Sequence, residues 1–181
     1  MDLREKKTKR SISNAFLQLR SKKPLEKITV KELCELAEIS KATFYLHYKD
    51  IYDLSDNLQQ QVIKNILSHL NDPKDIIYKL QEAHIQIIEG YYANENIVHI
   101  LFSGSQFAKL PECIEHEIKK MIFQQFPNLE HDAKTNIRIT YQMMGSFYAF
   151  YKYEKQFGHE TVLNTVNDIT KLLTINQSFE M

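Results

Sequence analysis

The stretch ITVKELCELAEISKATFYLHYKDIYDL, residues Ile28–Leu54, contains three closely spaced helix-capping signals. Thr29 and Glu32 fit a capping box, in which the Thr29 hydroxyl accepts from the Glu32 amide and the Glu32 side chain reaches back. Ser40 is the next N-cap candidate and Asp50 is a third. The stretch therefore predicts two short helices, followed by the start of a longer one.

The two short helices are separated by only a few residues around Glu38 and Ile39, which is the spacing of a helix-turn-helix. In that motif the second helix enters the DNA major groove and the first helix crosses the backbone. On the second helix, Phe44 and Tyr48 stand four residues apart and are expected to pack inward. The first helix is expected to bury Leu33, Leu36 and Ala37.

The other side chains of the second helix carry groups that suit nucleic acid. Lys41 suits a guanine edge or a phosphate, and the hydroxyl and imidazole groups suit phosphate oxygens. Ala42 has little bulk, so it would allow close approach or touch a thymine methyl. The outward-facing set is predicted to be Lys41, Ala42, Thr43, Tyr45 and His47.

Composition and charge describe a globular chain with one basic end. Of 181 residues, 43% are hydrophobic and 25% are charged, and only four glycines and four prolines occur, which favours long helices. Residues 1–49 hold 12 Lys and Arg against 6 Asp and Glu, whereas residues 50–181 hold 11 against 17. This asymmetry is typical of a protein that sets one end on phosphate. A solvated basic face would explain it equally well.

Hydrophobic periodicity predicts helices along almost the whole chain and no strand. We therefore expect an all-α fold of about nine helices. Besides the motif, the expected helices cover residues 4–21, 51–70, 74–94, 95–106, 112–126, 132–157 and 160–176. The expected organisation is a helix-turn-helix head over 1–50 with its motif at about 29–48, a joining helix over 51–70, and a C-terminal domain over 74–181.

The motif resembles the DNA-binding signature of the TetR family of bacterial transcription regulators, over about residues 8–60. The matching positions are Thr29, Ala37, Ser40, Thr43, Tyr45, His47 and the step Tyr48-Lys49-Asp50. The resemblance implies that DNA is contacted by Thr29, Ser40, Lys41, Ala42, Thr43, Tyr45, His47 and Lys49.

The resemblance also implies a homodimeric repressor. The two C-terminal helices of each subunit would form a four-helix bundle, which sets two heads on a pseudo-palindromic double-stranded DNA operator. A small-molecule effector in the C-terminal domain would release the DNA. No cofactor is expected. The sequence has no recognisable secretory signal or membrane span, so a cytoplasmic protein is expected.

Two positions depart from the family pattern. Glu38 stands in the turn where Gly is usual, and Gly suits a positive φ. Ile51 stands where a Lys near the start of the next helix usually anchors a phosphate, a contact that Lys49 could replace. These departures favour an alternative hypothesis, a protein-interaction factor or coactivator on the same fold with weak or no operator binding.

The segment 133–157 carries apolar residues on two sides, and a helix that is apolar all round is buried all round. One side is expected to meet the subunit's own core and another a partner subunit, with Gly145 and Ser146 allowing close approach. A central core helix in a monomer is the alternative. The first side holds Ile137, Tyr141, Met144 and Tyr148, and the second Met143, Phe147 and Phe150. The last helix offers a further stripe at Val162, Val166, Ile169 and Leu173.

Candidate ligand-binding residues lie in the C-terminal part, where aromatic and histidine side chains could line an effector pocket or belong to an ordinary core. The predicted pocket consists of His84, Tyr92, His99, Phe102, Tyr141, Met144 and Tyr148. The histidines lack metal-ligand spacing, so no metal site is expected. No nucleophile elbow, phosphate-binding loop or dinucleotide fingerprint occurs, so no enzymatic activity is expected. The cysteines, Cys34 and Cys113, are expected to be free thiols.

Overall fold

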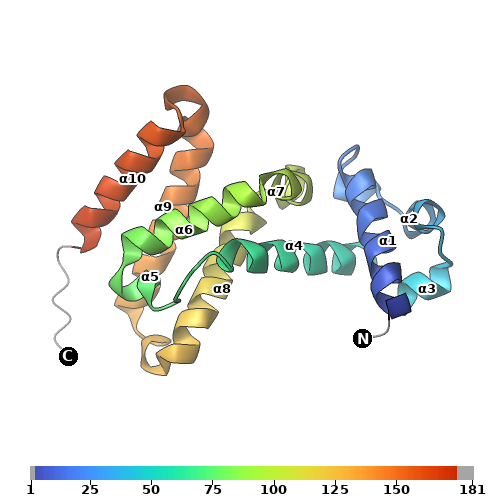
Figure 1. Ribbon diagram of the computed structural model, residues 1–181, viewed down its shortest axis with the longest axis horizontal. Helices are drawn as coiled ribbons and strands as arrows, with labels where there is room; N and C mark the ends of the chain where they lie inside the picture. The colour runs from blue at the N-terminus through green and yellow to red at the C-terminus, as the bar shows by residue number, and fades with distance from the viewer. Residues whose placement is uncertain (1–2, 175–181) are drawn as a thin grey trace. The chain divides into compact units, whose positions relative to one another are not determined.

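A computed structural model describes residues 3–174, with side chains as far as Leu172. Figure 1 shows this part of the chain as a succession of helices joined by short turns, with no strand among the described residues. The predicted all-α fold is confirmed. Within the same residues, no helix is both long enough and apolar enough to cross a bilayer.

The described residues form ten α-helices and three short 3₁₀ turns. In chain order these are α1 (Leu3–Arg20), η1 (Leu25–Lys27), α2 (Val30–Ala37), α3 (Lys41–Tyr45), α4 (Ile51–Leu67), α5 (Asp75–Tyr78), α6 (Leu80–Ala93), α7 (Glu95–Leu101), η2 (Gly104–Gln106), α8 (Lys109–Gln125), η3 (Pro127–Leu129), α9 (Ala133–Phe157) and α10 (His159–Thr174). The predicted residues 175 and 176 of the last helix lie outside the described part.

Several helices differ from their predicted extents. α7, predicted over 95–106, ends at Leu101, and two further differences have local reasons. The segment predicted as one helix over 74–94 is divided at Lys79, whose φ of −135° and ψ of 52° lie outside the helical region. This division raises the number of helices from about nine to ten. Pro111 lies in the first turn of α8, where its missing N–H has no intrahelical partner to lose, so α8 begins earlier than predicted.

The chain divides into two compact units. The first contains the described residues up to Lys64 together with Asn94–Leu110, and the second contains Asn65–Ala93 and the described residues from Pro111 onward. The helix-turn-helix therefore shares its unit with most of α4 and with α7. The predicted C-terminal domain contributes α7 to that first unit.

The first unit is built on an apolar stripe of α1. Ile12 and Phe16 are fully buried, as are Leu33 of α2 and Leu54 of α4. α1 packs on α2 and on α7. Burying an aliphatic or aromatic side chain of this size contributes about 2 kcal/mol, so the two motif helices rest on a well-packed support.

The second unit holds α6, α9 and α10 as packed neighbours, and Figure 1 shows α9 and α10 as an antiparallel pair. Gly158 separates them with a φ of 83°, a positive value that suits glycine at the end of a helix. α6 passes very close to the end of α4. A Cβ added to Gly90 would lie 2.2 Å from the backbone carbonyl oxygen of Ile66, so only glycine permits this approach.

Candidate nucleic-acid interface

The helix-turn-helix forms as predicted, and both of its helices begin at side-chain caps. Thr29 Oγ1 accepts a hydrogen bond from the backbone N–H of Glu32 at 3.3 Å. Ser40 Oγ accepts one from the backbone N–H of Thr43 at 3.0 Å. Each cap satisfies an N–H that has no partner inside its own helix. The two hydroxyls therefore hold the motif together, beside any contact they make with phosphate.

The second half of the predicted capping box is replaced by an ion pair. The Glu32 carboxylate binds the ammonium group of Lys23 and does not reach back to the start of α2. Lys23 lies in the loop after α1, so the pair links that loop to α2. Because both side chains are partly exposed, the pair adds little to stability.

The turn between α2 and α3 contains a left-handed residue. Glu38 has a φ of 54° and a ψ of 45°, and it is the one non-glycine residue with positive φ in the described part of the chain. The next N–H, of Ile39, donates to the Cys34 carbonyl at 3.0 Å, as in a Schellman ending. A residue with a Cβ is strained here by about 1–2 kcal/mol. Glu38 therefore adopts the positive φ that suits Gly at this position, and the chain keeps the turn in spite of the strain.

The inner face of α3 packs as predicted. Phe44 is fully buried and Tyr48 is 7% exposed, and their ring centroids lie 5.9 Å apart. Burial raises the pKa of the Tyr48 phenol. On α2, Leu33 is buried but Leu36 is 40% exposed, so the prediction that Leu36 packs inward is wrong. The buried face of α2 is formed by Leu33 and Cys34.

The outer face of α3 presents most of the predicted contact residues to solvent. Lys41 and Ala42 are exposed, and Tyr45 is 57% exposed. Thr43 and His47 are half-buried, and the Thr43 hydroxyl lies 2.9 Å from the Ser40 hydroxyl. These two side chains therefore flank the exposed face instead of forming its centre.

Leu46 is an exposed residue of this surface that the sequence reasoning missed. It is 81% exposed and follows the last residue of α3. The helical period gave the signal, because Leu46 lies four residues after Ala42. A leucine between aromatic neighbours is easily taken for core when the pattern is interpreted residue by residue.

Lys49 and Ile51 lie at the start of α4, which has a cap of its own. Asp50 Oδ1 accepts the N–H of Asp53 at 2.8 Å, and Asp53 Oδ2 accepts the N–H of Lys49 at 2.9 Å. The Lys49 side chain is exposed, whereas Ile51 is 5% exposed. A side chain buried at this position cannot reach a phosphate unless the surrounding packing rearranges. Ile51 is therefore a packing residue. Its neighbour Tyr52, 52% exposed, faces solvent.

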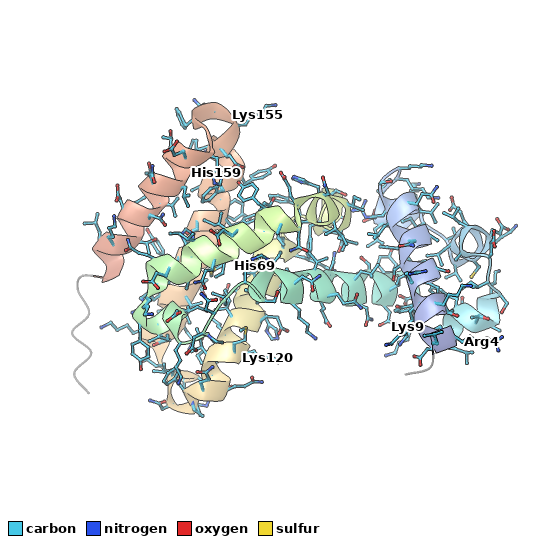
Figure 2. The ribbon with its side chains drawn as sticks, in the orientation of Figure 1. Arg4, Lys9, His69, Lys120, Lys155 and His159 are labelled. Carbon is cyan, nitrogen blue, oxygen red and sulfur yellow. The ribbon has the colours of Figure 1, made fainter. Side chains whose placement is uncertain are left out.

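The first half of α1 supplies further basic groups to the same unit. Arg4, Lys6, Lys7 and Arg10 are exposed, and Figure 2 labels Arg4 and Lys9 on this part of α1. Lys9 pairs with Glu5 one turn earlier at 2.9 Å, and this hydrogen bond raises the pKa of Lys9. The charge excess of this region was visible in the sequence, but these residues were not singled out there as contact candidates.

Buried polar groups join the C-terminal end of α1 to the segment that follows α7. Arg20 is 5% exposed, and its guanidinium donates to the Ser103 carbonyl at 2.8 Å and to the Lys23 carbonyl at 3.2 Å. Burial lowers the pKa of Arg20, opposed by the nearby Glu26 carboxylate. Glu26 in turn accepts a hydrogen bond from the Ser105 hydroxyl. These contacts make the segment after α7 a structural part of the first unit.

The second unit contains a small cavity of about 20 Å³, which is the room needed by one water-sized group. His84 and Gln142 are its main polar side chains. Among the described residues, Gln142 Nε2 is buried and has no hydrogen-bond partner. His84 Nδ1 lies 3.3 Å from Asn167 Oδ1, and burial lowers the pKa of His84. The lining is completed by Ile76, Leu80, Ala83, Ile87, Ile139, Met143, Ser146 and Thr170.

Of the seven predicted pocket residues, His84 lines this cavity. Tyr141 and Tyr148 are 65% and 47% exposed, and Met144 is half-buried. The cavity instead uses the side of α9 on which Ile139, Met143 and Ser146 recur at helical spacing. That spacing could have indicated the cavity-lining side in the sequence, but the larger aromatic residues nearby were chosen as pocket candidates instead.

The remaining predicted pocket residues lie elsewhere. His99 and Phe102 belong to the first unit; Phe102 is buried, and His99 is exposed with its Nε2 3.3 Å from Glu95 Oε1. Tyr92 donates to Glu154 in the last turn of α9. His159, which Figure 2 labels, places Nδ1 2.8 Å from the same carboxylate. The described residues contain no group of three or more side chains able to hold a metal ion.

α9 and α10 each leave apolar side chains exposed. Within α9 only Ile139 is buried among the described side chains, so α9 is not enclosed on all sides by its own subunit, as the alternative of a central core helix in a monomer required. No atom beyond the neighbouring backbone lies within 4 Å of a Cβ built on Gly145. Leu173 of the predicted α10 stripe lies outside the described side chains. The exposed large apolar residues are Ile137, Tyr141, Tyr148, Tyr151, Tyr153 and Phe157 of α9, and Ile169 and Leu172 of α10.

Comparison with known proteins identified a similar bacterial protein. The chain is 30% identical over 105 residues to the uncharacterized HTH-type transcriptional regulator YxbF of Bacillus subtilis strain 168. The match covers 56% of this chain and 28% of YxbF, so the chain spans less than a third of the length of that relative. No protein-family model and no solved structure matches the chain.

Proposed function

We propose that this protein is a helix-turn-helix transcription regulator that binds double-stranded DNA through α3. The observation that carries the proposal is the division of α3 between a buried face at Phe44 and Tyr48 and an exposed face with donors at Lys41 and Tyr45. The similarity to YxbF supports the same class of function. A helix exposed in this way fits the major groove, whose width admits one helix.

Each group has a distinct part in this proposal. Lys41 and Tyr45 would meet base edges or phosphates, and Lys49 would contact a phosphate beside the groove. The exposed cations at the start of α1 would add sequence-independent attraction. The binding should therefore weaken steeply with salt, by about 0.9 in the logarithmic slope for each phosphate contact.

The test is binding of fluorescent duplexes from the region upstream of the protein's own gene, measured across a salt series. Lys41→Ala and Lys49→Ala should each weaken binding, and a lost phosphate contact lowers the salt slope by about one. Lys74→Ala is the matched control, because Lys74 is an exposed lysine of the second unit. An absence of binding to every upstream fragment at low salt would overturn the proposal.

A lysine added at the start of α4 tests the phosphate contact directly. Ile51→Lys is unsuitable, because Ile51 is buried and a charge there would disturb folding. Tyr52→Lys adds the cation at an exposed position instead. We expect tighter binding at low salt and a salt slope steeper by about one. Unchanged affinity and slope would place this end of α4 away from the DNA.

We further propose a TetR-type arrangement in which α9 and α10 pair with their copies in a homodimer. The exposed apolar residues of both helices and the open surface at Gly145 support this, because such residues gain most when covered. A four-helix bundle would bury them. Sedimentation velocity should give a dimer, and Tyr141→Glu should give a monomer that keeps its helical circular dichroism. A monomeric wild-type protein at micromolar concentration would contradict this arrangement.

Release by a small-molecule effector is the remaining part of the proposed repressor. The cavity beside His84 and Gln142 supports it, because a buried amide N–H₂ without a described partner is a ready donor to a ligand oxygen. An effector larger than water would have to separate α6 from α9 and α10. Compounds that raise the melting temperature should weaken DNA binding, and Gln142→Leu should reduce both effects. Ligands that stabilise the protein without changing DNA affinity would contradict effector-controlled release.

A further inference from the structure

The exposed face of α3 consists of two parallel rows with different chemistry. Lys41 and Tyr45 stand four residues apart and form a row of donors, whereas Ala42 and Leu46 stand four residues apart and form an apolar row. Leu46 keeps helical angles, with φ −69° and ψ −21°, and its N–H donates to the Ala42 carbonyl at 3.2 Å. The helical geometry therefore sets Leu46 one turn beyond Ala42 on the same side.

Packing within the protein does not account for Leu46. It is 81% exposed, and among the large apolar residues with described side chains only Leu3, at the start of α1, is more exposed. A single exposed leucine is ordinary on a protein surface. Here, however, the leucine lies beside exposed donors, and the residue one turn earlier is a small alanine. Together they form a short apolar strip on the surface proposed to enter the groove.

We propose that Leu46, supported by Ala42, reads the 5-methyl group of a thymine, so that an A·T pair is selected at a fixed position of the bound site. The inference rests on the proposed DNA binding and deepens it. The thymine methyl is the apolar group that base pairs present in the major groove. An apolar side chain gains from covering that methyl, and Lys41 in the adjacent row can engage a neighbouring guanine or phosphate. The contact gives Leu46 a role in sequence specificity that needs no hydrogen bond.

The experiment removes the methyl from the DNA and leaves the base pairing intact. Duplexes bound by the wild-type protein are first selected from a random double-stranded library. The selected duplex is then remade with deoxyuridine in place of one thymidine at a time, which removes the methyl and keeps the O4 acceptor. We expect a position at which this replacement weakens binding about four-fold, the effect of uncovering one methyl-sized apolar group.

Variants assign that effect to its residue. Leu46→Ala should bind the thymidine and deoxyuridine duplexes equally, because the side chain that covers the methyl is gone. The matched control is Leu36→Ala on α2, an exposed leucine outside the proposed strip, which should keep the four-fold difference. Both positions are exposed, so both variants should fold, and circular dichroism verifies this.

The outcomes separate this inference from the function on which it rests. If the wild-type protein binds DNA but no thymine position is sensitive, or if Leu46→Ala keeps the sensitivity, the inference is overturned and DNA binding stands. If Leu46→Ala changes neither the affinity nor the thymine sensitivity, Leu46 does not contact the DNA and is available to a protein partner. This outcome also overturns the inference. If no duplex is bound at low salt, DNA binding itself fails, and the inference fails with it.

Discussion

The helices α3 and α9 are both rich in aromatic residues, yet they distribute them differently. In α3, a short helix, Phe44 is fully buried while the adjacent Tyr45 is 57% exposed. In α9 the aromatic residues are spread over several sides, and Tyr141, Tyr148 and Tyr151 are all exposed. Aromatic content alone therefore does not identify core. The face on which each ring lies decides whether it supports folding or remains available to a partner.

The largest expected effect tests the division within α3. Phe44→Ala should destabilise the protein by about 3–5 kcal/mol, because it leaves a cavity in the packed interior. Tyr45→Ala should change stability by less than about 0.5 kcal/mol while weakening DNA binding. Urea unfolding monitored by circular dichroism measures both. Similar losses of stability for the two variants would contradict the division of faces.

The second prediction compares a buried and an exposed isoleucine of α9. Ile139 is 4% exposed and Ile137 is 68% exposed, so Ile139→Ala should cost about 2–4 kcal/mol of unfolding free energy. Ile137→Ala should leave the fold nearly unchanged and weaken the proposed dimer roughly ten-fold, which corresponds to about 1.4 kcal/mol of lost apolar contact. Unfolding is measured at low protein concentration and dimerisation by sedimentation. A dimer that is insensitive to Ile137→Ala would move the proposed interface away from this face.

The contrast between the two helices also explains what the sequence could and could not predict. The fold class, the capped motif helices and the burial of Phe44 and Tyr48 follow from local signals, since caps and four-residue spacing act within one or two turns. The place of Glu38 in the turn singled it out as a departure from the usual Gly, although its left-handed conformation was seen only in the structure. These features needed no knowledge of distant segments.

Other features depend on segments that are far apart in the sequence. The exposure of α9 depends on how little of it α6 and α10 cover, and the cavity at His84 depends on four helices at once, α5, α6, α9 and α10. The burial of Ile51 and the joining of Arg20 to Ser103 similarly arise from tertiary packing. Periodicity gives the sides of a helix but not which side packs against a neighbouring helix, so it could not select His84 and Gln142 as the polar side chains of one cavity.

The third prediction, of intermediate size, is a dependence of protein stability on pH through His84, which is buried beside α9. Burial lowers the pKa of His84 below its ordinary value of about 6.5. The unfolded chain therefore binds a proton near that pH that the folded protein does not. Stability should be fully present above pH 6.5 and should fall below it, by up to about 1.4 kcal/mol per pH unit, until the lowered pKa of the folded state is reached.

Unfolding free energies measured between pH 5 and 8 test this pH dependence. His84→Gln should remove the contribution of this residue, since glutamine keeps a donor for Asn167 and does not titrate. His99→Gln is a suitable control, because His99 is an exposed histidine. Equal slopes for the wild-type protein and His84→Gln would show that His84 accepts a proton in the folded state without penalty.

The smallest predicted change in stability concerns Glu38, in the turn before α3. Glu38→Gly should stabilise the protein by about 0.5–1 kcal/mol, because the relief of about 1–2 kcal/mol of left-handed strain exceeds the extra chain entropy that glycine gives the unfolded state. Glu38→Ala removes the carboxylate but keeps the Cβ, so it should leave the strain in place. If Glu38→Ala stabilises the protein as much as Glu38→Gly does, the destabilisation at this position comes from the carboxylate charge and not from backbone strain. A gain found with glycine alone would show that the motif tolerates strain between two well-capped helices, with no need for the usual glycine.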